Sequence, residues 1–488
     1  MSQYDVVMIN TPLVRYGFNL SGVVSIPHLG LGYLGAVLDR AGYRVAYRNA
    51  QFTPENPLLH PAGLPDAPIY FLTAKITNLA PTHEIAVGLK RLKPNARVVL
   101  GGPCNIVQPD LLFEQFPAFD LLATGEGEAI VVPLVEALLA GGDMDALRAV
   151  PGMAIRHGDS TIDTGPAPSA DLNEKLFPLR RLWRHHPLRL HPPYGIFPPA
   201  TLMETARGCS YNCRFCCISK EPRSRPIDWV VEEARELVED RGVREIHFVD
   251  PTFTMDPDRA LALCRRLQDV RGSLHWSCKT RPDCVSPALL REMAASGCYM
   301  IAYGIESAAS EVLDQVNKSI DLEQTRRALE ETHAAGIRSI GYVLVGSPGE
   351  TSATIRRTNR FIRKANTWFV LFGVYLPLPD AEREPDKAAL IPEIIRYYTT
   401  GRSKEFETVA PAGFTHRQLN RWLLHSVLSF YFYPPAVWRI LRGFGSLREV
   451  LHYGRGAAFL VAELGRFALR RFRSRFARNV QFSDSNKA

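Results

Sequence analysis

Apolar residues fall into short runs that alternate with stretches of helical period. From the N-terminus to about residue 145, the runs predict buried strands and the periodic stretches predict helices. The expected strands are residues 4–9, 44–49, 69–74 and 98–100, the expected helices are 29–41, 82–92 and 109–116, and a strand, a glycine-rich turn and a helix follow within 120–141. This alternation indicates an α/β fold with a parallel, doubly wound, Rossmann-like sheet.

A second alternation begins at Thr201, after the Pro-rich segment HPPYGIFPP (191–199). The expected strands are residues 202–206, 245–250, 274–279, 299–306, 339–346 and 368–376, and the helices between them are 228–241, 257–270, 287–296, 322–335 and 351–365. This succession predicts a full or partial (β/α)6 barrel, with its chemistry at the C-terminal mouth of the strands.

The pattern divides the chain into four parts. We expect a Rossmann-like domain at 1–145, a linker at 146–198, the barrel at 199–385 and a helical, basic C-terminal region at 386–488. The net charge of +8 is concentrated near the end, in the arginines between residues 466 and 478, which indicates a local surface. No nucleic-acid recognition motif accompanies these arginines, so we expect no nucleic-acid partner.

Cysteine usage and apolar runs point to the compartment. Nine cysteines in 488 residues form no dense disulfide framework, and the start, MSQYDVVMINTP, has no signal-peptide pattern. No uninterrupted apolar run approaches the roughly 18 residues of a membrane span. We therefore expect a protein of the reducing cytoplasm, where thiolates are free to bind metal.

The segment RGCSYNCRFCC (207–217) concentrates four of these cysteines. Cys209, Cys213 and Cys216 follow a predicted strand, and three soft ligands on one loop can hold three corners of an iron-sulfur cube, leaving the fourth iron open. The alternative is a structural zinc site, but such sites close with four ligands in pairs, and no second C-x2-C or H-x3-H pair is present.

The spacing C-x3-C-x-aromatic-C after the first strand of a barrel resembles the radical S-adenosylmethionine (SAM) superfamily. The resemblance implies that Cys209, Cys213 and Cys216 carry a [4Fe-4S] cluster whose open iron binds SAM, and that Phe215 lies beside the adenine. A cluster of this kind can reduce SAM to a 5'-deoxyadenosyl radical, while the protein supplies orientation and exclusion of competing reactions.

Four downstream segments match the same family in order: FVDPTFT (248–254), WSCKTRPD (276–283), YGIES (303–307) and VGSPGET (345–351). The resemblance implies that Asp250 approaches the SAM methionine, that Glu306 binds the ribose and that Gly346 packs near the adenine. Lys279 and Arg281 suit a carboxylate, and Arg281 is preferred because its fork is bidentate. Taken singly, these segments have alternatives: Arg281 and Glu306 form a solvated pair, and Gly346 lies in an ordinary turn.

The first domain has no G-x-G-x-x-G after its first strand. The motifs INTP (9–12), PHLGLGYLGAVLDRAGYRV (27–45), VVLGGPC (98–104) and TGEGEA (124–129) instead resemble the cobalamin-binding domain of B12-dependent radical SAM enzymes. The cobalamin contacts that this implies are Pro12, Thr73, Lys75, Gly101, Gly102, Gly125, Glu126 and Gly127. The chain lacks D-x-H-x-x-G, so no histidine is expected below the cobalt, and an alternative is that the domain keeps its fold without the corrin.

The combined resemblance implies an enzyme with a [4Fe-4S] cluster, SAM and cobalamin as cofactors. The activity most common in that branch is C-methylation of an unactivated carbon of a small natural product or lipid-like molecule, through a 5'-deoxyadenosyl radical and methylcobalamin. An electron donor such as flavodoxin or ferredoxin is expected as a partner. The alternatives are a radical oxidative cyclase or ring-rearranging enzyme without methyl transfer, and a non-catalytic cobalamin or redox-sensing module.

The C-terminal region combines aromatic residues and arginines at helical spacing (419–444 and 447–476). The interpretation that we favour is a helical cap that packs an apolar stripe on the barrel. The alternatives are a peripheral membrane surface and a pocket for an acidic or lipid-like substrate.

Overall fold

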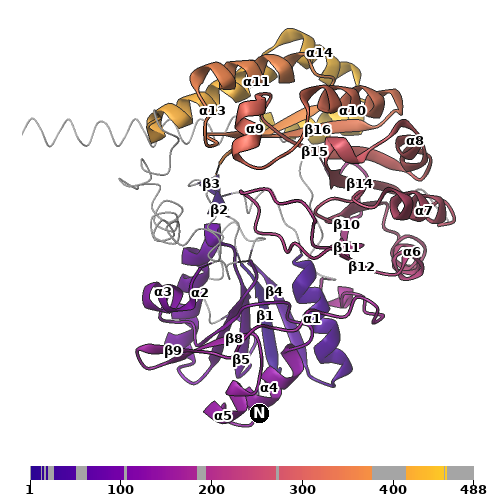
Figure 1. Ribbon diagram of the computed structural model, residues 1–488. Helices are drawn as coiled ribbons and strands as arrows, with labels where there is room; N and C mark the ends of the chain where they lie inside the picture. The colour runs from indigo at the N-terminus through magenta and orange to yellow at the C-terminus, as the bar shows by residue number, and fades with distance from the viewer. Residues whose placement is uncertain are drawn as a thin grey trace, which may run out of the picture.

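The computed structural model describes residues 2–11, 14–15, 18–19, 27–50, 63–103, 107–183, 194–270, 274–375, 414–455 and 457–458. They form two α/β units, which lie in the lower and upper parts of Figure 1. A small hairpin, β2 (Val14–Arg15) with β3 (Phe18–Asn19), belongs to the N-terminal part of the chain.

The first unit is a seven-stranded sheet in the order β4-β1-β5-β6-β7-β8-β9. Its parallel strands are β1 (Val6–Asn10), β4 (Val45–Asn49), β5 (Ile69–Thr73), β6 (Arg97–Gly101) and β7 (Leu121–Ala123). The chain adds β4 on one side of β1 and then β5, β6 and β7 on the other side. The strand order therefore reverses between β1 and β5, and doubly wound sheets bind their ligands at such a switch point. The expected Rossmann-like fold is confirmed.

The helices of this unit cover both faces of the sheet. They are α1 (Leu29–Arg40), η4 (Ile76–Asn78), α2 (Leu79–Leu92), α3 (Pro109–Gln115), α4 (Val131–Leu139) and α5 (Met144–Arg148). Successive strand residues point to opposite faces, so Tyr70 and Leu72 pack with α2 and α3, whereas Ile69 and Phe71 pack with α1 and α4. Two separate cores result, one on each side of the sheet.

The sheet continues past residue 145, where the sequence placed the end of the first domain. β8 (Met153–His157) pairs antiparallel with β7, and β9 (Ser160–Asp163) pairs antiparallel with β8. β9 escaped prediction because it lies at the edge and carries no buried residue, and β8 because its buried run is only three residues long, 153–155. The first unit therefore extends to Asp163, and the first part of the expected linker belongs to it.

The second unit is a six-stranded sheet whose strands pair in chain order, all parallel. The strands are β10 (Ala200–Met203), β13 (Glu245–Phe248), β14 (His275–Thr280), β15 (Cys298–Glu306), β16 (Arg338–Val345) and β17 (Phe369–Val374). Within the described residues, β10 and β17 are the two edges and do not pair with each other. The sheet is therefore a partial barrel, one of the two forms that the sequence predicts.

Helices lie between successive strands of this sheet. They are α6 (Ile227–Arg235), which continues as a π-helical turn η6 (Glu236–Asp240), α7 (Pro257–Leu267), η7 (Pro282–Cys284), α8 (Pro287–Ala295), α9 (Ser310–Gln315), α10 (Leu322–Ala334) and α11 (Ser352–Lys364). The short helix α9 was not predicted, because six residues are too few to show a period. It follows β15 and positions the segment 316–318, which contacts the cysteine loop.

The C-terminal helices α13 (His416–Tyr431) and α14 (Pro434–Arg442) lie along the upper edge of the second unit in Figure 1. Phe430 is fully buried in the barrel core, so this region packs an apolar stripe on the barrel, as we expected. Leu428, Phe432 and Trp438 remain exposed. In the described part of the chain, no helix is both long and apolar enough to cross a membrane. The arginines at 466–478 lie outside the described residues.

A buried ion-pair cluster fastens the linker to the barrel. Arg180, in the 3-10 turn η5 (Arg180–Trp183), lies 2.5 Å from Glu233 of α6, and Arg225 lies 2.7 Å from the other carboxylate oxygen of Glu233. The Glu233 side chain is 1% exposed. Arg180 also donates to the Thr201 hydroxyl at the start of β10. One carboxylate thus bridges two buried guanidinium groups.

Replacing Glu233 by alanine leaves both arginines buried without a counter-charge. Loss of one partner of a buried ion pair costs about 3–5 kcal/mol, so the free energy of unfolding of Glu233→Ala should fall by about that amount. The matched control is Glu232→Ala, which removes a half-exposed partner of Lys175 and should cost under about 1 kcal/mol. Denaturant unfolding of the three proteins measures both values, and equal losses would contradict the prediction.

Candidate functional site

The three cluster cysteines lie in the loop of a tight hairpin at the C-terminal end of β10. β11 (Ala206–Arg207) pairs antiparallel with β12 (Arg223–Ser224), and the loop between them holds residues 208–222. Gly208 opens the loop with φ 76°, and a Cβ there would lie 2.1 Å from the Glu221 carbonyl oxygen. Only glycine can precede Cys209 without moving the opposite strand.

Backbone and side-chain hydrogen bonds hold the loop in shape. The Cys209 amide donates to the Ser219 carbonyl (2.9 Å), and the Lys220 ammonium donates to the Tyr211 carbonyl (3.1 Å). The segment after α9 supports the loop from outside, since the Arg214 amide donates to the Val316 carbonyl (3.0 Å). The cysteines are therefore placed by a structured loop with several anchors.

Positive charge lies beside the cysteine thiols. Burial raises the pKa of Cys213, while Lys318 and Arg281 act to lower it, and an Arg281 Nη atom lies 3.9 Å from the Cys213 sulfur. Cys209 is buried, with its sulfur 3.6 Å from the Thr252 hydroxyl. Metal binding requires the thiolate form, and neighbouring cations favour that form.

The arrangement fits a cluster better than a single ion. Among the described residues, no three His, Cys, Asp or Glu side chains converge as the ligands of one metal ion do. Three thiolates that each bind a different iron of a cube need not converge. Cys217 is exposed and adjacent to Cys216. The donor set therefore fits a [4Fe-4S] cluster held by three cysteines, with one iron left for another ligand.

Arg281 is bound by the protein itself. Its guanidinium donates to both carboxylate oxygens of Asp283 (2.9 and 2.8 Å) and lies 3.6 Å above the Tyr211 ring. The alternative of a solvated Arg281–Glu306 pair is wrong, because both side chains are buried and have other partners. The bidentate fork that made Arg281 attractive for a SAM carboxylate is occupied by Asp283.

Lys279 lies on β14 two residues before Arg281 and has a different environment. Burial lowers its pKa, and the nearby charges of Asp250 and Cys216 raise it. Within the described part of the chain, its ammonium makes no hydrogen bond or ion pair of its own. A half-buried ammonium near a cluster cysteine is suited to a carboxylate ligand.

Asp250 is buried and binds the chain. One carboxylate oxygen accepts from the Thr205 amide (2.7 Å) and the other from the Thr205 hydroxyl (2.5 Å). Thr205 is the residue between β10 and the hairpin, so Asp250 fixes the direction in which the chain enters the cysteine loop. The structure brings Asp250 to the base of the loop, where both of its oxygens are occupied.

Glu306 ends β15 in a strained conformation. Its φ is 58°, in the left-handed region that residues with a Cβ rarely adopt, and its carboxylate lies 2.6 Å from the Lys318 ammonium. The Lys318 ammonium lies 5.8 Å from the centre of the Phe215 ring. Lys318 is a site residue that sequence reasoning missed. It lies in a turn without a motif, and the structure brings it together with Glu306, Phe215 and Cys213.

Gly346 occupies the turn after β16 with φ 90°. A Cβ there would lie 3.0 Å from the Leu419 side chain of α13, so the turn also packs against the C-terminal region. The Glu350 carboxylate accepts from the Gly346 and Ser347 amides. Burial raises the pKa of Glu350 to about 7, although these two backbone hydrogen bonds act to lower it.

In the first unit, polar residues gather at the C-terminal ends of β1 and β5, the switch point of the sheet. The Asn10 amide donates to Asn49 (3.1 Å), and the Thr11 hydroxyl donates to the Thr73 carbonyl (2.5 Å). Gly101 ends the adjacent strand, and among the described residues a Cβ there would meet only Ala123, at 3.9 Å. We call this region, with Lys75 in the next loop, the cobalamin edge.

His28 belongs to the cobalamin edge and was not predicted. Its Nδ1 accepts from the Leu31 amide (3.3 Å) and caps α1, and its Nε2 lies 3.2 Å from the Thr73 hydroxyl. Burial, followed by the charge of Lys75, lowers the pKa of His28 to about 4. The imidazole is therefore uncharged at neutral pH, and both ring nitrogens are engaged by the protein.

Several expected cobalamin contacts pack against the chain itself. A Cβ at Gly125 would lie 2.5 Å from the Ala167 Cβ, and one at Gly127 would lie 2.8 Å from the Leu34 side chain. Gly102 has φ 93°, and a Cβ there would lie 2.8 Å from the Ala74 carbonyl oxygen. Glu126 pairs with Arg223 at 2.5 Å. Pro12 and Cys104 lie outside the described residues.

The cobalamin edge faces the cysteine loop. Glu126 and Glu128 follow β7, at the same edge of the sheet as the ends of β1 and β5. They pair with Arg223 (2.5 Å) and Arg207 (2.6 Å) of the hairpin that carries the cysteine loop. The described residues Thr73, Lys75 and Gly101 fit a large planar ligand that approaches the strand ends, on the side that the cysteine loop also occupies.

Comparison with known families agrees with this division. Residues 21–135 match the B12 binding domain, and residues 203–362 match the radical SAM superfamily. The match to the B12 binding domain implies cobalamin, and the match to the radical SAM superfamily implies SAM and a [4Fe-4S] cluster.

The alignments with relatives span most of the chain. The chain is 26% identical over 381 residues to an uncharacterised methyltransferase, PH0819, from Pyrococcus horikoshii, covering 76% of this chain and 80% of the relative. It is 26% identical over 408 residues to the anaerobic magnesium-protoporphyrin IX monomethyl ester cyclase of Cereibacter sphaeroides, covering 80% and 65%. The fold matches TsrM from Kitasatospora setae, a radical SAM methyltransferase solved with cobalamin and a [4Fe-4S] cluster, with a TM-score of 0.63, 20% identity and coverage of 78% and 77%.

Adjacent cysteines allow a matched test of the cluster ligands. Cys216→Ala should lose most of the iron and sulfide and the broad visible absorbance after anaerobic reconstitution, because one corner of the cube loses its thiolate. Cys217→Ala removes the neighbouring, exposed thiol and should retain about four irons per chain, as the unmodified protein does. The opposite ranking of the two variants would show that the ligand set is misassigned.

Proposed function

Because the chain is a radical SAM enzyme with a B12-binding domain, we propose that it transfers a methyl group to an unactivated carbon of a small molecule. The observation that carries the proposal is the contact between the two units: Glu126 and Glu128, after β7 of the first sheet, pair with Arg223 (2.5 Å) and Arg207 (2.6 Å) of the cysteine hairpin. Two cofactors can act on one substrate only if their sites open toward a common space. When bound, the cluster with SAM would supply a hydrogen-abstracting radical and the cobalamin a transferable methyl group.

The residues of this chain would hold and orient the cofactors. Cys209, Cys213 and Cys216 would bind three irons, and the positive charges of Arg281 and Lys318 would stabilise the thiolates. The pair of Asp283 with Arg281 keeps that cation beside Cys213. An external one-electron donor such as flavodoxin or ferredoxin would reduce the cluster.

For SAM, we propose Lys279 as the carboxylate partner in place of Arg281. Its ammonium lies near Cys216, whereas the Arg281 fork is held by Asp283. Phe215 would pack beside the adenine, with Lys318 on the same ring. Gly346 would remain a backbone contact to the adenine, at the turn that Glu350 fixes. Asp250 would act indirectly, by directing the entry to the cysteine loop.

For cobalamin, we propose contacts at Thr73, Lys75 and Gly101. These residues lie at the switch point of the sheet, where doubly wound folds bind their ligands. His28 would not bind cobalt, because both of its ring nitrogens are engaged within the protein.

Isotope labelling separates methylation from the second candidate, radical cyclisation, which the similarity to the protoporphyrin ester cyclase favours. The reconstituted, reduced enzyme is incubated with methyl-deuterated SAM and a small-molecule extract of the organism that encodes it. Methylation predicts a product that carries the deuterated methyl group, together with 5'-deoxyadenosine. Formation of 5'-deoxyadenosine with an unlabelled, oxidised product would favour cyclisation, and absence of any SAM cleavage would favour a non-catalytic module.

The role of Lys279 is tested by SAM binding. Lys279→Met should raise the Kd for SAM by about 10-fold or more, since a charge-assisted contact worth roughly 1.5–3 kcal/mol is lost, while the iron content is unchanged. Lys364→Met, at the surface end of α11, is the control and should leave the Kd unchanged. Equilibrium binding to the anaerobic enzyme measures both, and an unaltered affinity of Lys279→Met would remove this residue from the SAM site.

A further inference from the structure

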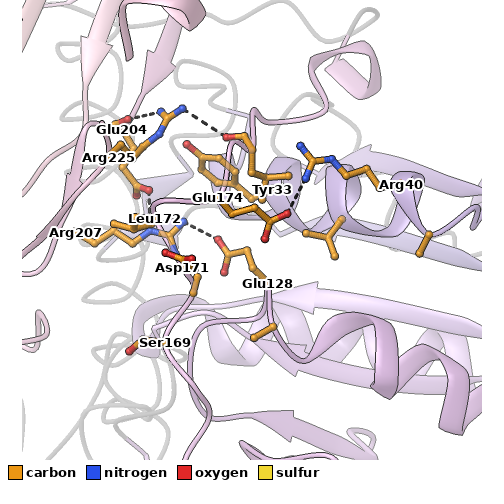
Figure 2. Close-up of a pocket in the computed structure, with 15 residues that line it drawn as sticks. Tyr33, Arg40, Glu128, Ser169, Asp171, Leu172, Glu174, Glu204, Arg207 and Arg225 are labelled. Atoms are coloured by element: carbon orange, nitrogen blue, oxygen red, sulfur yellow. Dashed lines mark hydrogen bonds and ion pairs between the residues drawn. The ribbon is translucent and has the colours of Figure 1, made fainter. Parts of the chain in front are cut away.

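A cavity of about 470 Å³ lies between the first unit, the linker and the barrel (Figure 2). Tyr33 and Glu128 line it from the first unit, Asp171 lines it from the linker, and Glu204 and Arg207 line it from the barrel. Charged side chains from both units meet at this cavity, and the dashed line in Figure 2 joins Arg207 to Glu128 across the boundary.

Arg207 is the centre of this contact. Its guanidinium donates to Glu204 of its own unit (2.7 Å) and to Glu128 of the first unit (2.6 Å), and it lies 3.3 Å from Glu126 of the first unit. The Arg207 side chain is 15% exposed and that of Glu128 is 12% exposed. An ion pair shielded from solvent to this degree is less screened than one at the surface.

A second arginine reinforces the contact. Arg223, opposite Arg207 in the cysteine hairpin, lies 2.5 Å from Glu126, and it also donates to the Ala170 carbonyl (2.7 Å). Glu126 in turn accepts from the Ala170 amide (2.7 Å). We call Glu126, Glu128, Glu204, Arg207 and Arg223 the interdomain ion network. It joins the first unit, the linker and both strands of the hairpin.

The position of this network in the chain gives it a consequence for the cofactors. Arg207 precedes the cluster ligand Cys209 by two residues, and the intervening Gly208 is locked by the Glu221 carbonyl. Glu126 and Glu128 follow β7 of the sheet whose strand ends form the cobalamin edge. A displacement of Arg207 relative to these glutamates would therefore displace the cysteine loop relative to the cobalamin edge.

The charges in the network are not balanced among themselves. Three carboxylates face two guanidinium groups, and burial raises the pKa of Glu204 to about 7 despite the opposing effect of Arg207. Removal of Arg207 would leave Glu128 of the first unit and Glu204 of the barrel without their shared cation. The contact between the two units would weaken at this point, because the ion pair across the boundary is lost.

We propose that Arg207 is a positioning residue that sets the distance between the cluster and the cobalamin by tying the cysteine hairpin to Glu126 and Glu128. This inference rests on the proposed function for its catalytic consequence only. The ion pairs that join the cysteine hairpin to Glu126 and Glu128 are present in the protein without cofactors. In the proposed function, SAM cleavage requires only residues of the barrel, whereas methyl transfer requires that the barrel and the cobalamin edge hold their cofactors at the right distance.

The tie is tested first in the protein without cofactors, by hydrogen exchange of backbone amides. In Arg207→Met and in Glu128→Gln, exchange at 124–129 and 206–210 should become faster by about 10-fold or more, because the interface opens more often. Arg40→Met, which breaks the exposed Arg40–Glu174 pair at the same cavity, is the matched control and should not change it. Exchange in both variants equal to that of the control would overturn the proposal.

The distance between cofactors is tested by electron paramagnetic resonance. With a reduced cluster and cob(II)alamin bound, the magnetic interaction between the two centres should become weaker or more widely distributed in Glu128→Gln, because the distance between them is less well fixed. This substitution leaves the cysteine hairpin unaltered. Iron and corrin contents should stay at those of the unmodified enzyme. An unchanged interaction would overturn the proposal, and so would loss of the cluster from Glu128→Gln, since the network would then only maintain the loop.

The catalytic consequence is the ratio of 5'-deoxyadenosine formed to methylated product. This ratio should rise severalfold in Glu128→Gln and in Arg207→Met. In Arg207→Lys the ratio should rise less, because lysine keeps the positive charge but cannot bind all three carboxylates as the guanidinium does. If the unmodified enzyme forms no methylated product, the proposed function fails, while hydrogen exchange and the magnetic interaction still decide the role of Arg207.

Discussion

Positive charge beside the cysteine loop is the interaction on which the rest of the site depends. Burial of Cys213 favours the neutral thiol, and only the cations of Arg281 and Lys318 act against it. Each of these cations is itself buried and needs a carboxylate, which Asp283 and Glu306 supply. Glu306 has a left-handed backbone, with φ 58°, at the residue whose carboxylate lies 2.6 Å from the Lys318 ammonium. The cations beside the cysteines and the acids that pair with them thus form one set of buried charges.

Much of the fold could be predicted from the sequence because its signals are local or periodic. Buried parallel strands appear as apolar runs, and the helices between them show a 3.6-residue period, so both sheets were expected. The cysteine loop was also visible, because its three ligands lie within eight consecutive residues, 209–216. The edge strand β9 was missed for the converse reason, since it buries no residue, and the buried run of its neighbour β8 is only three residues long.

The partners of the charged residues could not be predicted in the same way. Arg281 and Glu306 lie at the ends of adjacent strands, so a pair between them was reasonable, but the β-bulge near Glu306 and the turn at 316–318 give Glu306 a different cation. Glu126 was assigned to the corrin from its motif, yet the hairpin of the other unit brings Arg223 to it. The first pairing depends on a bulge and a turn and the second on how the two units pack together, and neither motif contains that information.

The acidic residues of the site follow a common rule that has a physical reason. Asp250, Asp283 and Glu306 all point toward the chain, where they bind an amide, an arginine and a lysine. A cluster with thiolate ligands, a SAM carboxylate and the phosphate of a corrin nucleotide all carry negative charge, so free carboxylates among them would oppose binding. Acids that orient cations avoid this repulsion and still fix the geometry. In the proposed site, Lys279 of the barrel and Lys75 of the cobalamin edge would supply the positive charge that these anionic groups need.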